Sequence, residues 1–444
     1  MPWHGIGNPS FYLLSAFVMA SFRLLCTGDV HLGRRPTRVP ADEALTVERV
    51  WQACVQAAIR EAVDAVVLTG DLIDRENRYF EAIGPLLQGL RQLATAGIPV
   101  YAVAGNHDFD TLPGVQAFDG EGAHLLGAQG RWTQQPLIKD GETVAILTGW
   151  SFPQQHVDQS PLRSFERPAT DLPVIGVLHA DAGTAQSRYA PVAHQELQES
   201  GVDLWLLGHI HRPQMLDLPG TQVLYPGSLQ PLDPGEQGAH GPWIIEVPMR
   251  GAATLTQRPL ATLRYAEVTV SLDGCTTNDA VRRQTTVAME DVLAAHVEAQ
   301  EALRHLCCRL RIEGRTPLHR QLDDLLADVQ PDLSLMQGSA TATVEQVDVD
   351  TRPVHDLQEL SRGTDPPAVL AQLLLALEEG REVDGLAALE AQLSQALRHL
   401  QRSTRYQPLR QDDAIALDTE AGTPRELLQR QGLRLLDELL AAHP

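Results

Sequence analysis

The sequence predicts an α/β protein in which two packed β-sheets are flanked by helices. Between residues 22 and 260, apolar runs of strand length alternate with stretches of helical periodicity. The strand-like runs are continuously apolar, which is typical of strands that are buried on both faces. After residue 110 the runs become shorter, and Pro and Gly residues separate them. This change of rhythm indicates two packed sheets flanked by helices.

The individual elements follow one another in a regular order. The first segments alternate as strand, helix, strand, helix and strand, over residues 22–27, 46–63, 65–70, 80–97 and 100–105. Shorter strand-like runs come next, namely VAILTGW, PVIGVLHA, DLWLLGHIH, QVLYPGS and WIIEV. Together these elements predict one large domain, for which we expect the bounds 19–262.

The character of the sequence changes near residue 262. A run YAEVTVSL leads into a helical stretch over roughly 278–304, followed by the strand-like runs CCRLRIEG and ATATVEQVDVD. This pattern predicts a small α+β domain over 263–352. In the remaining part, 353–444, apolar residues recur at helical spacing and predict amphipathic helices. These helices either pack on their own domain or offer a face to a partner, and the pattern leaves both open.

The first residues form an extension ahead of the predicted domain. They contain an apolar segment that has no positively charged leader and is too short to span a bilayer. Met19 begins the run MASFRLLCTGDVH, directly ahead of the first strand. We therefore expect residues 1–18 to come from an upstream start codon and to be disordered and functionally neutral.

Composition limits the possible partners and the compartment. The formal net charge of −22 predicts a surface that on average repels nucleic acid and anionic membranes, so any contact with DNA must be local. Hydrophobic residues at 43% and charged residues at 21% exclude a disordered or fibrous chain. The five cysteines are odd in number and show no C-x-x-C spacing, which predicts reduced thiols in the cytoplasm.

Five short motifs at the ends of strand-like runs carry the chemistry. They are GDVH, GDLID, GNHD, LHA and GHIH, with the polar residues Asp29, His31, Asp71, Asn106, His107, Asp108, His179, His209 and His211. Ligand sites of open α/β sheets lie at the carboxyl ends of the strands, so these side chains are expected to converge. Mixed oxygen and nitrogen donors suit Mn, Fe, Zn or Co, whereas Mg and Ca prefer oxygen. The set contains few carboxylates for so many ligands, so one carboxylate that bridges two divalent ions is the economical arrangement. Asp71 is the natural bridge.

Each motif taken alone has a structural interpretation. A single D-x-H or G-D is more often a turn, and a histidine such as His179 after an apolar run is more often a core residue. Glycine, asparagine and histidine in GNHD and GHIH also suit tight turns. The decisive observation is the conjunction, because packing alone does not place five such motifs at strand ends.

The ordered motif set resembles the calcineurin-like metallophosphoesterases over roughly residues 22–260. The segments HLGR at 31–34 and YPGSLQPLDPGEQGAHGPWIIEV at 225–247, together with the added small domain, resemble the SbcD/YhaO-type bacterial DNA-repair exonucleases. The resemblance implies a four-layer α-β-β-α sandwich, a small α+β capping domain that binds DNA, and C-terminal helices.

The resemblance also implies which residues hold two divalent metal ions, for which Mn²⁺ is expected. One ion is held by Asp29, His31 and His211. The other is held by Asn106, His179 and His209. Asp71 lies between the two ions.

Three further residues of the same motifs are not assigned as metal ligands. The resemblance implies that His107 stabilises or protonates the leaving oxygen, with Asp108 as its orienting partner. The second motif reads GDLID, so Asp74 stands where some nucleases of this branch carry a histidine. The role of position 74 therefore stays open.

The implied reaction is hydrolysis of a phosphodiester. Two divalent ions lower the pKa of a shared water molecule and clamp the attacking and leaving oxygens of an in-line displacement. For DNA the resemblance implies a 3′-to-5′ exonuclease that releases 5′ phosphates, an SbcC-like ATPase as partner, and a homodimer. Arginines beside the motifs offer a local positive rim for phosphates, although they are also consistent with ordinary solvated side chains: Arg34, Arg35, Arg75 and Arg212.

Three functions remain in competition at this point. The favoured one is a DNA exonuclease or endonuclease subunit that works with an ATPase docked on the C-terminal helices. The second is a phosphoesterase of a small molecule such as a nucleotide, with the C-terminal region as a lid or dimerisation element. The third is a scaffolding subunit with a structural metal site, which the complete set of ligand types disfavours.

Overall fold

The computed structural model describes most of the chain. The described residues are 21–76, 81–120, 122–184, 186–322, 325–326, 333–381, 388–389, 391–395 and 424–442. The expected N-terminal extension, residues 1–18, lies outside them. The chain separates into two compact units, of which the first comprises residues 1–268, 287–310 and 330–347 and the second residues 269–286, 311–329 and 348–444.

The first unit contains a mixed six-stranded sheet built around the N-terminal strand. Strands β1 to β4 are parallel neighbours, and β13 and β14 extend the sheet in antiparallel fashion beyond β1. The order is β14-β13-β1-β2-β3-β4. Their bounds are β1 Phe22–Thr27, β2 Ala65–Leu68, β3 Val100–Ala102, β4 Ala123–Leu125, β13 Trp243–Val247 and β14 Thr254–Gln257.

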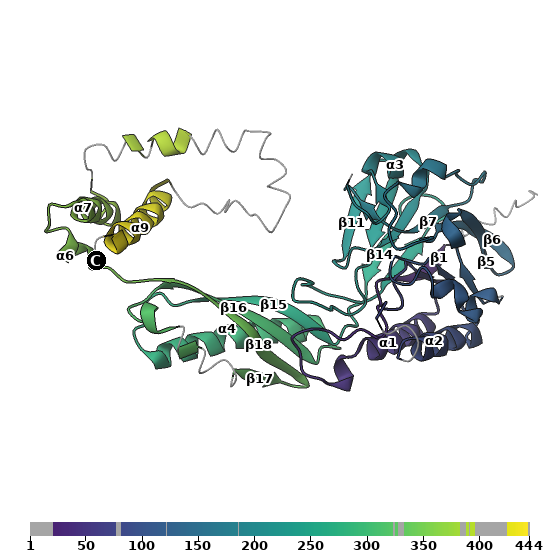
Figure 1. Ribbon diagram of the computed structural model, residues 1–444, viewed down its shortest axis with the longest axis horizontal. Coiled ribbons are helices and arrows are strands. Elements are labelled where there is room, and N and C mark those ends of the chain that lie inside the picture. Colours follow the sequence, from purple (N-terminus) through teal and green to yellow (C-terminus); the bar gives the residue numbers. More distant parts are fainter. Residues whose placement is uncertain are drawn as a thin grey trace, which may run out of the picture. The chain divides into compact units, whose positions relative to one another are not determined.

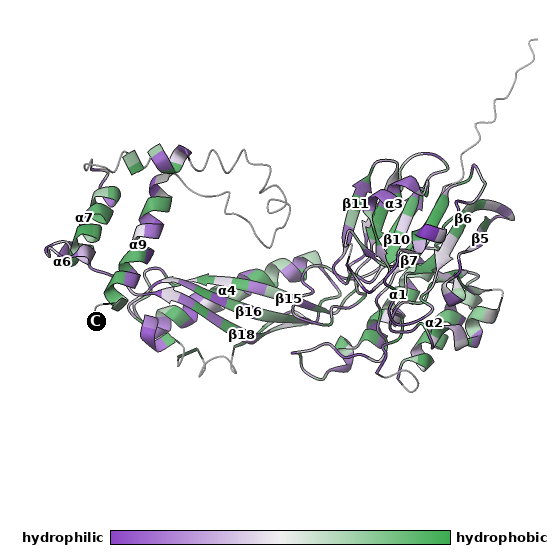
Figure 2. Cartoon of the chain, turned by 45° about the horizontal axis from the view of Figure 1, so that its top comes forward, coloured by the Kyte–Doolittle hydropathy of each residue, from purple (hydrophilic) through white to green (hydrophobic). Residues whose placement is uncertain are grey.

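A second six-stranded sheet packs against the first. Its order is β11-β12-β10-β7-β6-β5, with parallel pairing among β6, β7, β10 and β12 and antiparallel pairing at both edges. The bounds are β5 Thr133–Lys139, β6 Glu142–Trp150, β7 Val174–His179, β10 Leu204–Gly208, β11 Gln214–Leu218 and β12 Thr221–Tyr225. Figure 2 shows that the inner strands β7 and β10 are hydrophobic, as expected for strands buried on both faces.

Alternation along the strands explains the layers. In β1, Phe22, Leu24 and Cys26 face the core between the two sheets, whereas Leu25 faces the helices. In β10, Trp205 and Leu207 belong to the core on the outer face of the second sheet. Helices α1 (Val47–Arg60) and α2 (Ile83–Thr95) cover the first sheet, and α3 (His194–Glu199) lies on the opposite side (Figure 1). The predicted two sheets flanked by helices are confirmed.

Helix α1 illustrates how the sequence specifies an outer layer. Thr46 caps its start by accepting a hydrogen bond from the amide of Arg49 at 3.4 Å. Glu48 in the first turn and Arg60 in the last complement the helix dipole. The buried side chains recur at helical spacing and form one stripe: Val47, Val50, Trp51, Cys54, Val55, Ala57 and Ala58.

Short elements lie in the connections between the larger strands and helices. A two-stranded sheet pairs β8 (Asp181–Ala182) with β9 (Pro191–Val192). The 3₁₀ helices are η1 Glu43–Leu45, η2 Leu112–Gly114, η3 Gln116–Asp119, η4 Ala128–Gly130, η5 Pro161–Ser164 and η6 His319–Gln321.

A four-stranded sheet with one long helix follows the sandwich in the sequence. The order is β15-β16-β18-β17, with β15 Leu263–Ser271, β16 His305–Arg315, β17 Ser334–Gln337 and β18 Ala340–Arg352. Helix α4 spans Asn278–Ala299, a few residues shorter than the sequence pattern suggested. It ends where the buried Gln300 side chain bonds the backbone carbonyl of Ala261 and accepts a hydrogen bond from Arg264.

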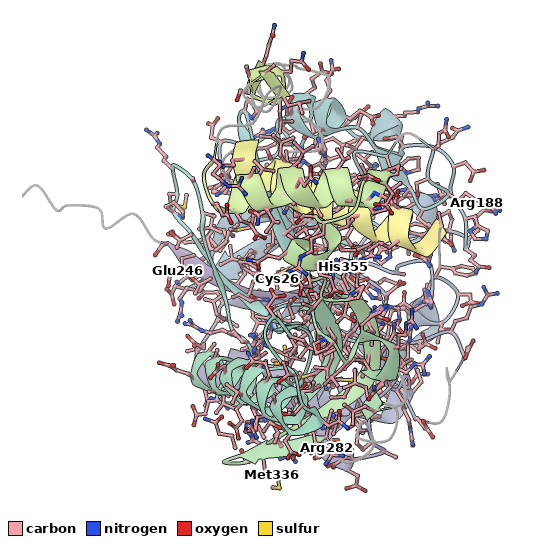
Figure 3. The ribbon with its side chains drawn as sticks, turned by 90° about the vertical axis from the view of Figure 1, so that its left-hand side faces the viewer. Cys26, Arg188, Glu246, Arg282, Met336 and His355 are labelled. Atoms are coloured by element: carbon pink, nitrogen blue, oxygen red, sulfur yellow. The ribbon has the colours of Figure 1, made fainter. Side chains whose placement is uncertain are left out.

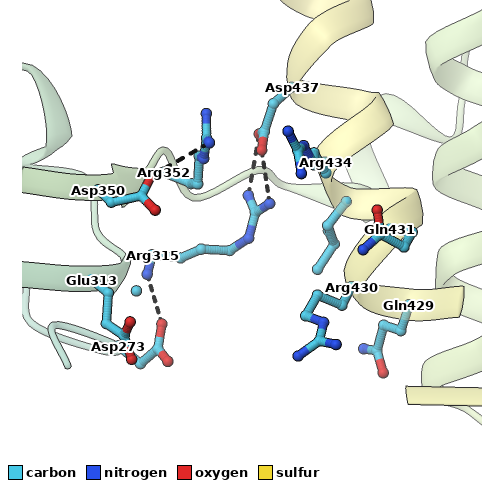
Figure 4. A pocket seen from close by; sticks show the side chains of 12 residues that line it. Asp273, Glu313, Arg315, Asp350, Arg352, Gln429, Arg430, Gln431, Arg434 and Asp437 are labelled. Atoms are coloured by element: carbon cyan, nitrogen blue, oxygen red, sulfur yellow. Dashed lines mark hydrogen bonds and ion pairs between the residues drawn. The ribbon is translucent and has the colours of Figure 1, made fainter. Parts of the chain in front are cut away.

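The C-terminal helices of the second unit pack on one another. They are α6 (Leu357–Leu360), α7 (Pro366–Glu378) and α9 (Pro424–Ala442), and their apolar core includes Leu374, Leu377 and Leu436. Most of the helical segment expected over 383–401 lies outside the described residues. Figure 4 shows the fork of Arg315 on the carboxylate of Asp437, with Nη2 to Oδ2 at 2.9 Å, which ties α9 to the end of β16.

Two observations concern the surface and the thiols. The cysteines are free, and Cys26 lies inside the protein whereas Met336 on β17 projects into solvent (Figure 3). Among the helices of the described segments, none combines the length and apolar character needed to cross a bilayer.

Candidate metal centre

The five motifs meet where the parallel strands of both sheets end. Residues after β1, β2 and β3 come from the first sheet, and the end of β7 and the residues after β10 come from the second. Because β1, β2 and β3 are parallel neighbours, as are β7 and β10, their carboxyl ends open on the same side. The geometry thus brings side chains up to 182 positions apart, Asp29 and His211, into one cluster.

Glycines in the motifs allow the strand ends to approach closely. A Cβ added at Gly105 would lie 2.2 Å from Oδ1 of Asp71, and one at Gly208 would lie 2.2 Å from the carbonyl oxygen of Thr69. Any side chain at either position would collide with the site or its backbone. This explains physically why glycine precedes the polar residues in GNHD and GHIH.

Four of the predicted ligands adopt a backbone conformation that residues with a side chain rarely take. Their φ angles are 45° for Asp29, 50° for His31, 50° for Asp71 and 95° for His209. Such strain is held in place only where the surrounding structure demands it, and it concentrates at functional sites. Each residue turns at the end of its strand, and the turn directs its side chain into the cluster.

The first donor cluster consists of Asp29, His31 and His211. Nε2 of His31 lies 3.1 Å from Nε2 of His211, and Nε2 of His211 lies 3.9 Å from Oδ1 of Asp29. One ligand atom from each residue falls within 4.8 Å of the others. The structure therefore brings together the three residues expected to share one ion.

The second donor cluster is built around His179. Its Nε2 lies 3.1 Å from Oδ1 of Asn106 and 3.3 Å from Oδ2 of Asp71, while its Nδ1 is 3.0 Å from the carbonyl oxygen of Thr69. The same oxygen of Asp71 lies 3.9 Å from Nε2 of His31. Asp71 thus stands between the two clusters, where the sequence places a bridging carboxylate.

His209 is attached to the cluster in a different way from the other six. Its ring packs against the rings of His179, at a centroid distance of 5.4 Å, and Tyr189, at 4.8 Å. Its backbone amide lies 3.1 Å and 3.0 Å from the two carboxylate oxygens of Asp29. His209 therefore adjoins the second cluster and also fixes Asp29 through its main chain.

The donor set fits a pair of divalent cations. Asp29 and Asp71 are only 0% and 2% exposed, and within the described chain their recorded ion pairs are with histidines, not with Lys or Arg. Buried carboxylates are costly unless they are paired or coordinate a metal. Imidazole nitrogens together with carboxylate and amide oxygens are the donors that Mn, Fe, Zn and Co accept.

The pKa shifts within the cluster also support a cation-binding site. Burial raises the pKa of Asp29. Burial opposes protonation of His179, but the charge of Asp71 outweighs it and raises the pKa of His179 to about 9. Burial and the neighbouring His179 lower the pKa of His209 to about 3. The shift of His179 shows that Asp71 attracts positive charge into the cluster, and the shift of His209 keeps its imidazole neutral, the form that binds a cation.

His107 lies at the edge of the cluster with its side chain 32% exposed. Its backbone amide donates to Oδ1 of Asp71 at 2.8 Å, and Nδ1 of its ring lies 3.5 Å from Oδ1 of Asp74. The carboxylate of Asp74 beside the ring raises the pKa of His107. The imidazole can therefore hold a proton at a place that solvent and substrate can reach.

Asp108 occupies a different position from the one expected of an orienting partner for His107. It is fully buried, and its carboxylate accepts hydrogen bonds from the backbone amides of Leu72 at 2.7 Å and Gly105 at 2.8 Å. The ring of His107 instead lies beside the carboxylate of Asp74, with Nδ1 3.5 Å from Oδ1. Asp108 shapes the backbone of two motif loops, because its carboxylate points inward to their amides.

Comparison with known proteins agrees with this arrangement. The calcineurin-like phosphoesterase family matches residues 22–213, and the middle domain of metallophosphoesterase YhaO matches residues 265–352. The chain therefore contains a calcineurin-like phosphoesterase domain, followed by a middle domain of the metallophosphoesterase YhaO type. Its phosphoesterase domain contains all the motif residues described above.

Curated relatives of this metallophosphoesterase include bacterial and archaeal proteins. The uncharacterized metallophosphoesterase YhaO of Bacillus subtilis is 32% identical over 44% of this chain and 48% of its own length. DNA double-strand break repair protein Mre11 of Aeropyrum pernix is 27% identical over 64% and 72%, respectively. The Mre11 protein of Haloferax volcanii is 31% identical over 57% and 55%. The chain thus spans about half the length of the first and third of these relatives.

The arginines near the metallophosphoesterase motifs differ in their surroundings. Nη2 of Arg34 lies 2.8 Å from Oδ2 of Asp233, so its charge is already paired. Arg35, Arg75 and Arg212 are exposed. A positive rim at this site would therefore rest on Arg35 and Arg212 more than on Arg34.

Sequence reasoning left two carboxylates of the metallophosphoesterase site without a role. Asp74 was visible as a departure from the motif, but its position beside His107 was not. Glu236 lies in the quoted segment 225–247, and its Oε1 is 2.8 Å from Nδ1 of His211. The only signal in the sequence was an acidic residue in a Gly-rich turn, and this does not reveal its partner.

Proposed function

We propose that this metallophosphoesterase is a two-metal phosphodiesterase that cleaves DNA during repair. One observation carries the proposal: Asp71 stands between two donor clusters, with His107 at their solvent edge. Arrangements of this kind serve in-line displacement at phosphorus. The names of the Mre11 relatives support DNA as the substrate.

Each donor cluster would hold one ion, and Mn²⁺ is the ion we propose. Asp29, His31 and His211 would bind the first, Asn106, His179 and His209 the second, and Asp71 both. Two divalent ions held by these residues would lower the pKa of a water molecule and neutralise charge on the phosphoryl oxygens. The protein fixes the positions of four of these ligands through the strained turns at the strand ends.

His107 would supply the proton that the leaving group needs. In hydrolysis a bond forms between water oxygen and phosphorus, and the bond from phosphorus to the 3′ oxygen breaks. The proton on the imidazole then passes to that oxygen, and Asp74 on Nδ1 keeps the ring oriented. General acid catalysis of this type contributes roughly 10²- to 10⁴-fold in rate.

The finer assignment follows the branch that the chain resembles. We propose a 3′-to-5′ exonuclease, with endonuclease cleavage as the alternative, a homodimer, and an SbcC-like coiled-coil ATPase docked on the C-terminal helices. The free thiols support a cytoplasmic protein. Because the net charge is −22, DNA must bind through local cations such as Arg35, Arg75 and Arg212.

The proposal is tested with purified protein, Mn²⁺ and a long duplex labelled at either the 3′ or the 5′ end. Early release of the 3′ label as a mononucleotide is expected from wild type. Asp71→Asn should abolish cleavage, and His107→Ala should lower it by about 10²- to 10³-fold. His194→Ala, an exposed histidine at the start of α3, is the matched control and should cleave like wild type.

A small ester separates the competing functions. Hydrolysis of bis-p-nitrophenyl phosphate without any DNA cleavage, even with an added ATPase partner, would favour a small-molecule phosphoesterase. Absence of both activities in the Mn²⁺-bound protein would favour a scaffolding subunit. For a nuclease, added salt should weaken DNA cleavage steeply and leave ester hydrolysis nearly unchanged, because only DNA binding releases counterions.

A further inference from the structure

Glu236 lies behind one of the proposed metal ligands and is held on both of its oxygens. Oε1 lies 2.8 Å from Nδ1 of His211. Oε2 accepts hydrogen bonds from Oγ of Ser228 at 2.7 Å and from the amide of Leu232 at 3.1 Å. The side chain is buried, with the residue 9% exposed. Its carboxylate therefore has one fixed orientation.

The groups that hold Glu236 are themselves fixed. The amide of Ser228 donates to the carbonyl oxygen of His211 at 2.8 Å, which links the turn after β12 to the GHIH loop. Nδ1 of the fully buried His240 lies 2.9 Å from the carbonyl oxygen of Ser228 and 3.0 Å from its Oγ. The amide of Glu236 also donates to the carbonyl oxygen of Asp233 at 2.9 Å. The turn is thus a rigid support for one carboxylate.

This support determines which nitrogen of His211 is available to a cation. A carboxylate only accepts hydrogen bonds, so the imidazole must carry its hydrogen on Nδ1. Nε2 then keeps its lone pair, and it points to Nε2 of His31 at 3.1 Å and to Oδ1 of Asp29 at 3.9 Å. Ligating histidines commonly owe their tautomer and ring orientation to such a partner.

We propose that Glu236 is a positioning residue that fixes His211 as an Nε2 donor for one of the two divalent cations. The inference rests on the proposed two-metal function and extends it by one residue outside the motifs. It assigns a purpose to the segment YPGSLQPLDPGEQGAH, in which Ser228 and Leu232 hold the carboxylate of Glu236 and His240 supports Ser228.

The variant Glu236→Gln distinguishes positioning from simple packing. The amide has the same volume but only one acceptor oxygen, which will turn to the two donors on Ser228 and Leu232. Its NH₂ group then faces Nδ1 of His211 and forces the hydrogen onto Nε2. We expect one of two Mn²⁺ sites to weaken by about 10- to 100-fold while the other is unchanged, as measured by calorimetric titration of the apoprotein.

Controls and opposing outcomes complete the experiment. Glu246→Gln, a solvent-exposed carboxylate on β13, should bind both ions like wild type. The apoprotein of Glu236→Gln should retain the wild-type tryptophan fluorescence and melting temperature, because the volume of the side chain is preserved. Wild-type affinity at both sites, equal weakening of both, or loss of the folded apoprotein would refute the positioning role. Absence of Mn²⁺ binding by wild type would refute the two-metal function itself.

Discussion

Asp74 stands between two imidazoles of the site. Its Oδ1 lies 3.4 Å from Nδ1 of His31 and 3.5 Å from Nδ1 of His107. Burial alone would raise the pKa of Asp74, but the neighbouring imidazoles of His107 and His31 outweigh it and lower the pKa. A negative charge is therefore kept beside a ligand and beside the proposed acid.

Replacing this charge should affect catalysis through His107. We expect Asp74→Asn to lower kcat on DNA by at least about tenfold, because the imidazole loses the partner that orients it and favours its protonated form. The double variant Asp74→Asn/His107→Ala should be no slower than His107→Ala alone, since both changes remove one function. Single-turnover cleavage rates provide the measurement. Additive losses would show that Asp74 acts mainly elsewhere, and a Mn²⁺ titration would reveal whether His31 is involved.

The sequence was informative about residues whose role depends on their place along the chain. Strand ends converge in a parallel sheet, so the motif residues could be expected to meet, and the structure brings six of seven together by donor distances. Partners such as Asp74 and Glu236 could not be foreseen, because the pairing depends on the direction of a side chain across elements. Asp108 shows the same limit, since its carboxylate turns inward to the amides of Leu72 and Gly105.

Among the secondary-structure elements, β1 and α1 are joined by a cluster of ion pairs between the start of the strand and the end of the helix. Nη2 of Arg23 lies 2.8 Å from Oε2 of Glu61, and Nε of Arg258 lies 3.2 Å from Oε1. The hydrogen bond from Arg23 lowers the pKa of Glu61 below its ordinary value. The carboxylate therefore stabilises the folded state at pH values above its unfolded pKa of about 4.3. This contribution is lost as the pH falls through the lower folded pKa.

Glu61→Gln should destabilise the phosphoesterase domain by roughly 0.5–1 kcal/mol at neutral pH, as is usual for partly exposed ion pairs. The difference from wild type should shrink below about pH 4, where the wild-type carboxyl also becomes neutral. Urea unfolding followed by tryptophan fluorescence reports on this domain, because every tryptophan of the described chain lies between Trp51 and Trp243. A difference that stays constant with pH would indicate that the amide disturbs packing instead.

The attachment of α9 depends on one carboxylate. Asp437 accepts a hydrogen bond from Nη2 of Arg315 at 2.9 Å, and its Oδ1 lies 2.6 Å from Nε2 of His355. We expect Asp437→Ala to raise deuterium uptake over residues 424–442 without changing uptake in the phosphoesterase domain, because both partners lose their acceptor. Glu438→Ala, the exposed neighbour, should leave uptake unchanged. Equal protection in both variants would mean that the apolar core with α7 suffices.

Elements were predictable where a local pattern decides them. The apolar stripe and the capping residue Thr46 indicate α1, and continuous apolar runs indicate the inner strands. Pairing over long distances was not predictable, as for β13, which joins the first sheet beside β1 and pairs Cys26 with Trp243. The end of α4 was also missed, since a tertiary contact of Gln300 with Ala261 terminates it, and no local stop signal does.

For the whole molecule, cation binding should be coupled to folding. The proposed ligands come from both sheets, so a bound ion joins the two halves of the sandwich, and the unfolded chain offers no such site. At an ion concentration about 100 times Kd, each site would add about 2.7 kcal/mol to the free energy of unfolding. Mn²⁺ should thus raise the melting temperature of the phosphoesterase domain by several degrees, and EDTA should reverse the rise.

The acidity of the chain makes the control for this prediction essential. With a net charge of −22, any divalent cation relieves repulsion between surface carboxylates and stabilises the fold without a specific site. Ca²⁺ provides that general effect but prefers oxygen ligands, so it should stabilise less than Mn²⁺ at a site rich in imidazole. Asp71→Asn should respond equally to both ions, because it lacks the shared carboxylate. If wild type also responded equally to both, the stabilisation would come from the charged surface and not from the cluster at the strand ends.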